Sequence, residues 1–477
     1  MATCLIDGEW ISPNHGEKID VLNPCDGESY SSIDRAGKNE INKAVLAAQK
    51  AQNSHWGKMT ATERGRILMK FADLISKNQE EIAQIEARDT GKPISNARGD
   101  AAAVARYFEY YGAAADKIHG EQIPYLNGFH VQVIRVPHGV TAHIIPWNYP
   151  AQMFGRTLAP ALAMGNSCIL KPAEDACLSG LKLGQLSIEA GFPPGALNIV
   201  TGYGHEAGAA LTEHPGINFA TFTGSPEVGS LVQQSAAKNL VPCVLELGGK
   251  CPQVVFDDAN LEKAIPIIMK ALTQNAGQTC SAGTRLLIQK NIYEKFSSMV
   301  ANAFEKTSAG IPDMDLDCGP IINKKQFDRV HKFIEKAKST NIPLLASGKL
   351  AEGISENGFF IPPALFGEVP RDHNLACDEV FGPVLSAMPF EDEKDAIKLA
   401  NDSEYGLVSG VWTENGSRQM RLAKSIHTGQ VFINCYGAGG GVELPFGGMK
   451  KSGHGREKGL HALEEFSVTK TIVQFHE

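Results

Sequence analysis

The residue best placed for covalent chemistry is Cys280, the last residue of the run NAGQTC (residues 275–280). A helical pattern ends in a glycine turn there, and a cysteine on such a turn is open to approach by a ligand. Thiolates are strong nucleophiles and their thioesters are labile. Most of the ten cysteines are expected to be small, buried apolar residues. The neighbouring glycine modestly favours Cys280 as the reactive one.

Two further motifs carry groups suited to acid–base and oxyanion chemistry. Glu246 opens ELGGK (residues 246–250) at the end of an apolar strand pattern, where loss of solvent would raise its pKa toward that of a useful base. Asn148 lies in PWNYP (residues 146–150). The two prolines hold the backbone extended, so that the amide could donate to a developing oxyanion. An ordinary loop glutamate and a structural turn are the alternatives.

Phosphate and ribose binding are indicated by two strand ends. FTGSP (residues 222–226) follows an apolar strand and opens a helix that contains Gly229. Ser225 is a good N-cap, Pro226 fits the first helical position, and the free N–H groups would face a pyrophosphate. In KPAE (residues 171–174), Glu174 could accept hydrogen bonds from ribose hydroxyls, and Lys171 could reach the same ribose. Taken singly, a plain turn and a solvated charge pair explain these motifs better.

The elements that must position these motifs alternate between short apolar strands and helices, which predicts parallel sheets with crossover helices. In the first series we expect strands at 143–145, 167–170, 197–200 and 219–222 and helices at 176–190, 206–213 and 227–238. In the second we expect strands at 284–288, 319–321, 384–389 and 408–412 and helices at 262–276, 292–307, 324–337 and 393–401. Helices at 39–52, 61–89 and 97–119 and a strand at 131–136 precede them. The tail, 465–474, alternates like a strand, and such a terminal strand often pairs across an interface.

Composition limits the class of protein. A chain of 477 residues is expected to form two or three domains. The net charge of −8, without a basic block, argues against nucleic-acid or anionic-membrane partners. The sequence contains neither an apolar run of membrane-spanning length nor a secretion signal at its N-terminus, and the cysteines lack CxxC or zinc spacing. We therefore expect a cytoplasmic protein with free thiols and no metal.

Taken together, the motifs identify a resemblance. PWNYP, KPAE, FTGS, ELGGK, GQTC, EVFGPV and PFGG–K–SG–GRE occur in the order found in the aldehyde dehydrogenase superfamily, which the chain resembles from about Ile6 to Thr471. The resemblance implies an α/β fold with two doubly wound Rossmann-like domains and a small β oligomerisation element. The implied NAD-binding domain comprises 1–116 and 138–248, the catalytic domain 249–450, and the oligomerisation element 117–137 and 460–477. A homodimer or homotetramer is expected.

The resemblance also implies roles for individual residues. Cys280 is the implied nucleophile, Asn148 and the Cys280 N–H form the oxyanion hole, Glu246 activates the hydrolytic water, and Glu457 takes part in proton relay. The implied cofactor contacts are Ile145, Trp147, Lys171, Glu174, Gly224, Ser225, Gly229, Glu379 and Phe381. The implied substrate contacts are Tyr149, Met153, Arg156 and Phe446. NAD should be preferred over NADP, because Glu174 would repel a 2′-phosphate, an effect that Lys171 partly offsets.

The chain departs from this pattern near the substrate. Where many relatives have Trp-Lys, it has Arg156-Thr157, which puts a Lys–Glu relay in doubt and places a cation at the tunnel. Either Glu443 or a polar group of the substrate is expected to pair with Arg156, unless the side chain turns outward. GAGGGVE (residues 437–443) replaces aromatic residues and should form a wider, more pliable loop. These features favour a polar, anionic or bulky aromatic aldehyde.

Two other functions fit the same resemblance. An enzyme that passes the thioester to coenzyme A would not need a hydrolytic base, so Glu246 argues against it. A structural protein on the same fold would have lost its catalytic set, yet Cys280, Asn148, Glu246 and the cofactor glycine are all present.

Overall fold

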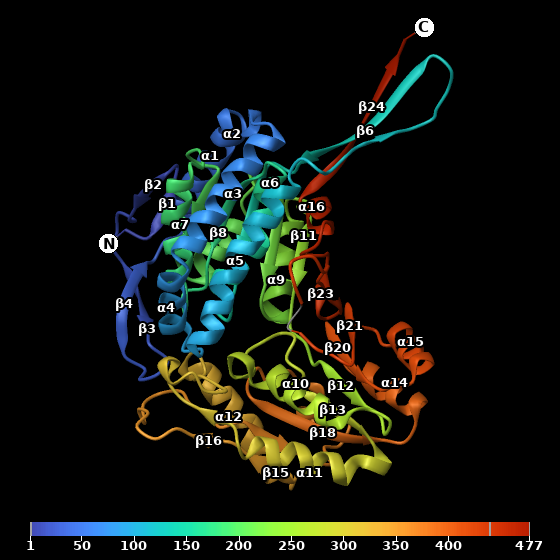
Figure 1. Cartoon of the computed structure of the whole chain (residues 1–477). Coiled ribbons are helices and arrows are strands. Elements are labelled where there is room, and N and C mark those ends of the chain that lie inside the picture. The colour runs from blue at the N-terminus through green and yellow to red at the C-terminus, as the bar shows by residue number, and fades with distance from the viewer. Residues whose placement is uncertain (1, 438–439, 477) are drawn as a thin grey trace.

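The computed structural model describes residues 2–437 and 440–476, which form two α/β bodies and a projecting arm (Figure 1). The first body contains an eight-stranded sheet in the order β2-β1-β9-β8-β7-β10-β11-β23. The strands from β9 to β11 are parallel, and antiparallel strands flank them on both sides. The bounds are β1 (Cys4–Ile6), β2 (Glu9–Ile11), β7 (Val140–Ile144), β8 (Ser167–Lys171), β9 (Leu197–Ile199), β10 (Phe219–Thr223), β11 (Cys243–Glu246) and β23 (Gly453–His454).

Helices of the first body cover this sheet. They are α1 (Lys38–Gln52), α2 (His55–Lys58), α3 (Ala61–Lys77), α4 (Gln79–Thr90), α5 (Ile94–Ala114), α6 (Pro150–Ala163), α7 (Leu178–Ala190), α8 (Ala209–Thr212) and α9 (Pro226–Ala237). The aromatic rings of Phe71, Phe108 and Phe154 interlock where α3, α5 and α6 meet. This packing anchors α6, whose first turn carries the residues after PWNYP. A separate hairpin consists of β3 (Lys18–Leu22) and β4 (Ser29–Asp34).

The second body contains a seven-stranded sheet in the order β15-β17-β18-β13-β12-β20-β21. Its strands are β12 (Pro252–Val255), β13 (Arg285–Gln289), β15 (Leu344–Ser347), β17 (Ala364–Phe366), β18 (Val384–Phe390), β20 (Val408–Trp412) and β21 (Gln430–Ile433), and only β15 runs antiparallel to its neighbour. Its helices are α10 (Leu261–Thr273), α11 (Tyr293–Phe304), α12 (Lys324–Ser339), α13 (Asn374–Cys377), α14 (Glu393–Asn401) and α15 (Gly416–Ser425). Two short pairs add β14 (Ser308–Ala309) to β16 (Lys349–Leu350) and β19 (Tyr405–Gly406) to β22 (Met449–Lys450). The two doubly wound domains of the predicted α/β fold are thus confirmed.

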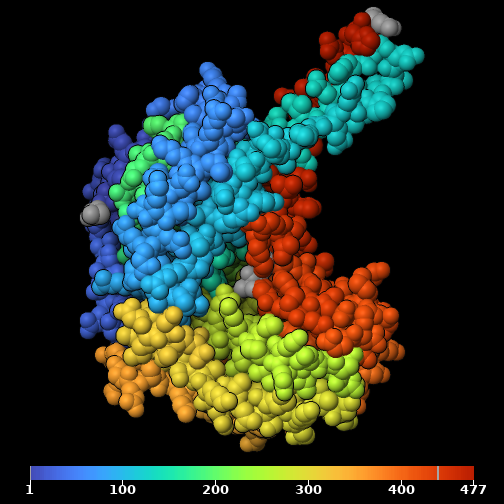
Figure 2. All heavy atoms as spheres, viewed as in Figure 1, coloured from blue at the N-terminus to red at the C-terminus, as the bar shows by residue number. Residues whose placement is uncertain are grey.

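The arm is a three-stranded ribbon that stands clear of both bodies (Figure 2). It consists of β5 (Glu121–Gln122), β6 (Phe129–Pro137) and β24 (Ser467–Phe475), with α16 (His461–Glu465) leading into the last strand. Strand β24 pairs with β6 from Ser467↔Pro137 to Phe475↔Phe129. The predicted strand in the tail is therefore present, and it pairs within its own chain. Its other edge is open in the order β24-β6-β5.

Three predicted elements differ from the structure. The helix predicted at 61–89 is two helices, because Asn78 leaves helical geometry and caps the end of α3 with its side-chain amide. The strand predicted at 319–321 is a loop, in which Gly319 lies so close to the backbone of Gly91 that a Cβ would overlap it. The helix predicted at 262–276 ends at Thr273 and gives way to a left-handed turn.

Other boundaries also shift. Helix 97–119 ends at Ala114, and helix 206–213 begins as a π-helical turn at Gly204–Gly208 before α8. The short N-terminal strands β1 to β4 were not predicted, because three to six residues carry too little periodic pattern. Within 2–437 and 440–476, no helix has the length and apolar character needed to cross a membrane.

Gly453 provides a test of how this fold holds Glu246. It has a φ of 104°, pairs with Glu246 across the β11–β23 ladder, and has no room for a Cβ beside the Leu245 carbonyl. Gly453→Ala should destabilise the protein by about 1–3 kcal/mol and displace Glu246, lowering both the melting temperature and the aldehyde oxidation expected from the resemblance.

Gly416→Ala is the matched control, because that glycine begins α15 and a Cβ added to it would meet nothing within 4 Å. Thermal unfolding and NADH formation should be unchanged in this variant. Wild-type values for Gly453→Ala would mean that the ladder does not set the position of Glu246.

Candidate active site

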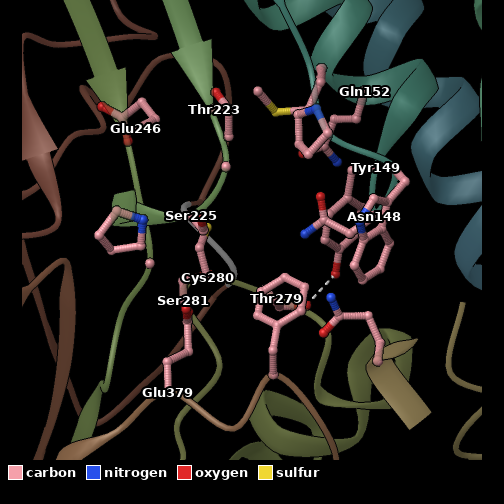
Figure 3. A pocket seen from close by; sticks show the side chains of 18 of the residues that line it. Asn148, Tyr149, Gln152, Thr223, Ser225, Glu246, Thr279, Cys280, Ser281 and Glu379 are labelled. Atoms are coloured by element: carbon pink, nitrogen blue, oxygen red, sulfur yellow. Dashed lines mark hydrogen bonds between the residues drawn. The ribbon is translucent and has the colours of Figure 1, made fainter. Parts of the chain in front are cut away.

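A cavity between the two bodies gathers most of the predicted site residues (Figure 3). The carboxyl ends of β10 and β11, the start of α6, the turn before β13 and the loop before β18 form its wall. The predicted residues in its lining are Trp147, Asn148, Tyr149, Met153, Arg156, Gly224, Ser225, Glu246, Cys280, Glu379, Phe381 and Phe446. Segments far apart in sequence therefore meet at one place, as parallel strand ends do in α/β sheets.

Cys280 is presented by a strained turn. Asn275, Ala276 and Gly277 have φ values of 51°, 54° and 71°, a left-handed run that costs energy for the two non-glycine residues. The carbonyl of Cys280 packs against Gly249 so closely that a side chain there would overlap it. Burial raises the pKa of the thiol to about 12, against a lowering influence from Arg156. At rest the sulfur is a thiol and needs a base to react.

Hydrogen bonds hold both the side chain and the backbone carbonyl of Asn148. Its side-chain Nδ2 donates to the Gln278 carbonyl at 2.9 Å, and its backbone carbonyl accepts from Asn275 Nδ2 at 2.9 Å. The second N–H of the Asn148 amide takes no part in these bonds and can reach a ligand oxygen. Figure 3 shows Asn148 and Tyr149 on one side of Cys280 and Glu246 on the other.

A buried lysine that was not predicted from the sequence supports Asn148. Lys92 Nζ donates to the Asn148 carbonyl at 3.0 Å, to Asp100 at 2.6 Å and to Glu86 at 3.2 Å. Glu86 also accepts from the backbone N–H of Ala151, in the first turn of α6. All three ammonium hydrogens are used, as a fully buried cation requires. No local signal marks Lys92, because Asn148 lies 56 residues away.

Glu246 and Glu457 both lie within 4 Å of one buried guanidinium, that of Arg156. Arg156 Nε is 2.5 Å from Glu457 Oε2, and its Nη2 is 3.4 Å from Glu246 Oε2. These distances define ion pairs, but their angles miss hydrogen-bond geometry, so both oxygens of Glu246 lack a hydrogen bond. Burial raises the pKa of Glu246 to about 8, although Arg156 opposes this. A carboxylate with this pKa and free lone pairs can take a proton from water.

Glu443, one of the two partners expected for Arg156, does not pair with it. Glu443 pairs with Arg106 on the surface at 2.8 Å, whereas Arg156 turns inward and lies over the Phe446 ring at 4.2 Å. The neighbouring Thr157 shares a hydrogen bond of 2.7 Å with His143 Nδ1.

The residues predicted to bind the cofactor separate into two groups. Trp147, Gly224, Ser225, Glu379 and Phe381 line the cavity. Ser225 caps α9 by accepting from the Val228 N–H at 3.3 Å, behind Pro226 at the first helical position. Phe381, at a φ of 58°, packs edge-on against Trp147 with ring centroids 5.4 Å apart. Glu379 Oε1 accepts from the Gly249 N–H at 2.8 Å.

The second group lies outside the cavity lining. Ile145 directly follows β7, Lys171 is the last residue of β8, and Glu174 lies three residues further on. Lys171 Nζ lies 2.7 Å from Glu174 Oε2. Gly229 faces Leu247, and a Cβ there would overlap the leucine side chain, so this glycine lets α9 pack closely on the chain after β11.

Several lining residues were not predicted. They are mainly polar and include Gln152, Thr223, Thr279, Ser281, Arg329 and Tyr405. Tyr149 Oη and Thr279 Oγ1 share a hydrogen bond of 2.7 Å, drawn as a dashed line in Figure 3. Arg329 donates to the Glu379 carbonyl at 2.7 Å and steadies that loop. The neighbouring motifs could have suggested Thr279 and Ser281, but nothing local indicated Arg329.

The glycine-rich loop near the substrate contacts is only partly described, since residues 438–439 lie outside the described ranges. Its neighbouring residues are fastened to the segment after Glu457. Lys458 Nζ donates to the Gly440 carbonyl at 2.9 Å, and the Gly459 N–H donates to Val442 at 2.7 Å. The pliability expected from the glycines stays a prediction.

Comparison with known proteins finds a matching family and solved structures of the same fold. A family model described as the aldehyde dehydrogenase family matches residues 10–472. A Burkholderia cenocepacia protein assigned as an aldehyde dehydrogenase shares 55% identity and a TM-score of 0.99, with 100% of each chain covered. PnpE from Pseudomonas sp. WBC-3, solved with nicotinamide adenine dinucleotide, shares 38% identity and a TM-score of 0.97 over 100% of this chain and 98% of its own. Mitochondrial benzaldehyde dehydrogenase from Antirrhinum majus is 40% identical over 98% of this chain and 88% of its own.

The raised pKa of Cys280 predicts how its alkylation depends on pH. Between pH 7 and 10 the thiolate fraction should rise about tenfold per pH unit, and the rate of iodoacetamide alkylation should follow it. Mass spectrometry of the Cys280 peptide would measure this rate, with the exposed Cys435 peptide as a check on reagent consumption. A rate that levels off by pH 8 would show that the thiolate already exists in the resting protein.

Proposed function

The chain belongs to the aldehyde dehydrogenase family, and we propose that it oxidises an aldehyde to a carboxylic acid through a thioester on Cys280, with NAD as hydride acceptor. Aldehyde oxidation and NAD(P) binding follow from the family. The thioester route, the residue roles and the preference for NAD are the proposal. The observation that carries it is the meeting of Cys280, Asn148 and Glu246 in one cavity with the cofactor motif of α9.

In the first half-reaction, Cys280 loses its thiol proton to a water molecule of the solvent, and its sulfur adds to the aldehyde carbon. The carbonyl oxygen becomes an oxyanion, which accepts from the free N–H of Asn148 and from the Cys280 backbone N–H. As the carbon–oxygen double bond reforms, the hydrogen on that carbon leaves with its electron pair. The product is a thioester on Cys280, oxidised by two electrons relative to the aldehyde.

In the second half-reaction, Glu246 removes a proton from water. The resulting hydroxide adds to the thioester carbonyl, the carbon–sulfur bond breaks, and the acid leaves while the Cys280 thiolate is regenerated. Transfer of the acyl group to coenzyme A would need no such base, so the presence of Glu246 supports hydrolysis. The intact set of Cys280, Asn148 and Glu246 likewise argues against a purely structural protein.

The residues present fit NAD. The bound nicotinamide would supply the two-electron acceptor at its C4 position. Ser225 and Gly224 at the start of α9 would hold the pyrophosphate, Lys171 and Glu174 the adenosine ribose, and Glu379 and Phe381 the nicotinamide side. The burial of Glu379 against Gly248 and Gly249 leaves its second carboxylate oxygen for a ribose hydroxyl. Ile145 and Trp147 would line the same site.

The substrate would lie against Tyr149, Met153 and Phe446, which give the cavity an apolar wall. An aromatic aldehyde suits this wall, in keeping with the name of the benzaldehyde dehydrogenase relative. Arg156 lines the same cavity, but Glu457 and Glu246 already balance its charge. We therefore favour an uncharged aromatic aldehyde over an anionic one, with a contact between substrate and Arg156 still a prediction.

We also propose the predicted domain division and an oligomer. Residues 1–116 and 138–248 would bind NAD, and 249–450 would carry the nucleophile. The arm, within 117–137 and 460–477, would pair with another copy, because the open edge of β24 exposes Val473 and Phe475 by 56% and 62%. A homodimer or homotetramer would cover this edge.

The proposed sequence of steps is tested by Glu246→Gln. Because hydride transfer precedes hydrolysis, this variant should release a first-turnover burst of NADH and then turn over at least about 100-fold more slowly. Stopped-flow absorbance with benzaldehyde and NAD measures both phases. Cys280→Ser is the matched control and should show neither burst nor turnover. A Glu246→Gln enzyme without a burst would place Glu246 in the first half-reaction.

The cofactor preference is tested at Glu174. Wild type should use NAD at least about tenfold better than NADP in kcat/KM, because a 2′-phosphate would meet this carboxylate. Glu174→Gln should reduce the ratio of kcat/KM for NAD to kcat/KM for NADP, mainly by lowering the KM for NADP. Lys171→Met should widen it, since that change removes the only cation paired with Glu174 among the described residues. Equal use of both cofactors by the wild type would contradict the assignment.

A further inference from the structure

Arg156 occupies an unusual position for a permanent cation. Its side chain is 7% exposed, in the first body's α6, and it points into the cavity between two glutamates from different segments. Glu457, 1% exposed, comes from the segment after β23, and Glu246, 2% exposed, from the end of β11. The guanidinium also lies over the Phe446 ring at 4.2 Å, which fixes its plane.

We propose that Arg156 is a positioning residue that apportions one positive charge between Glu457 and Glu246 and thereby sets when Glu246 can act as the hydrolytic base. The inference rests on the proposed function, in which Glu246 activates water. It gives Arg156, which already lines the cavity, the role of controlling the base.

The two contacts are unequal. Glu457 lies 2.5 Å from Arg156 Nε, and its other oxygen accepts from the Thr221 hydroxyl at 3.2 Å. Glu246 lies 3.4 Å from Nη2, and neither of its oxygens has a hydrogen bond. One cation cannot balance two buried carboxylates, and an unbalanced buried charge is costly. Glu246, whose oxygens have no hydrogen bond, therefore keeps its proton at neutral pH.

Two further cations, Arg456 and Lys458, also favour ionised Glu246, but neither forms an ion pair with it within 4 Å. From the segment after β23 it faces Arg456, Glu457 and Lys458, from α6 it faces Arg156, and from the turn before β13 the Cys280 thiol. Lys458 has its own acceptor in the Gly440 carbonyl, and Arg456 donates to Gly448 and Gly455. Arg156 is the one of these cations that the structure places within 4 Å of Glu246.

A guanidinium keeps its proton throughout the physiological pH range. Arg156 thus stabilises whichever glutamate is charged without taking up the proton that Glu246 removes from water. Ionised Glu246 gains an ion pair with Nη2, so raising the pH through its pKa of about 8 creates the base. Hydrolysis of the thioester should accelerate over the same range and then level off.

The signs of two substitutions follow. Arg156→Met removes the cation that favours ionised Glu246. The rise of the hydrolysis rate with pH should therefore occur at higher pH in this variant. Glu457→Gln removes the anion that disfavours ionised Glu246 and frees the guanidinium, so the rise should occur at lower pH. Each shift should be at least about one pH unit, the size expected for a close charge. Arg156→Lys keeps the cation and should restore most of the wild-type profile.

The experiment uses the full-length enzyme, acylated on Cys280 with p-nitrophenyl acetate and then freed of excess reagent, so that hydrolysis of the acyl-enzyme is followed without acylation or hydride transfer. The rate is measured from pH 6 to 10 for wild type and each variant. Arg98→Met is the matched control, because it removes an arginine from an exposed pair with Glu80, and its profile should equal that of wild type. Circular dichroism and NAD binding report folding.

Shifts of opposite sign in Arg156→Met and Glu457→Gln support the inference, whereas shifts of the same sign, or none, overturn it. If Arg156→Met fails to fold, the downward shift of Glu457→Gln decides alone. Glu246→Gln separates the two proposals. If that variant hydrolyses the acyl-enzyme as fast as wild type, the proposed base is wrong. If it is slow while the rise of the rate stays at the wild-type pH in the other variants, only the role of Arg156 is wrong.

Discussion

The site depends on backbone segments that approach one another more closely than any side chain would allow. Gly249 lies against the carbonyl of Cys280, Gly277 against Gly382, and Gly453 against Leu245. Each contact joins a different pair of segments, and together they bring the turn of the nucleophile, the end of β11 and the loop before β18 into one seam. A Cβ at any of them would push two catalytic segments apart. The glycines of GQTC and ELGGK therefore matter because of the neighbours they admit, as much as for the turns they make.

The second determinant is the pairing of buried charge. Around the cavity, Lys92 is matched to Glu86 and Asp100, and Arg156 to Glu457 and Glu246. The first group is fully hydrogen-bonded and holds Asn148 still. The second is only partly satisfied: both oxygens of Glu246, the group proposed to exchange protons, and Oε2 of Glu457 lack a hydrogen bond. The Lys92 network thus holds the site rigid, while the Arg156 network contains the group proposed to exchange protons.

The sequence predicted the parts of the structure that local pattern encodes. The strand–helix alternation indicated the two α/β bodies, and the order of motifs indicated the family and twelve of the residues that line the cavity. Helix ends at Asn78 and Thr273 were missed, because each depends on capping or on a strained turn that tertiary contacts stabilise. The partner of Arg156 was misassigned for a related reason. Glu443 is close along the chain to the substrate loop, but charge pairing depends on the fold, and Arg106 of α5 pairs with it instead.

The pairing of strands in the arm affects how the chain folds during its synthesis. Strand β24 pairs with a segment more than 300 residues before it, so β6 must wait for the last part of the chain to be synthesised. Until then a nine-residue strand with apolar side chains has the whole of one edge uncovered, and the two residues of β5 pair with only part of the other. Such a strand is prone to pair with the wrong partner, including β6 of another nascent chain. Slow translation or crowded expression should therefore lower the yield of native protein through this ribbon, well before the stability of either α/β body becomes limiting.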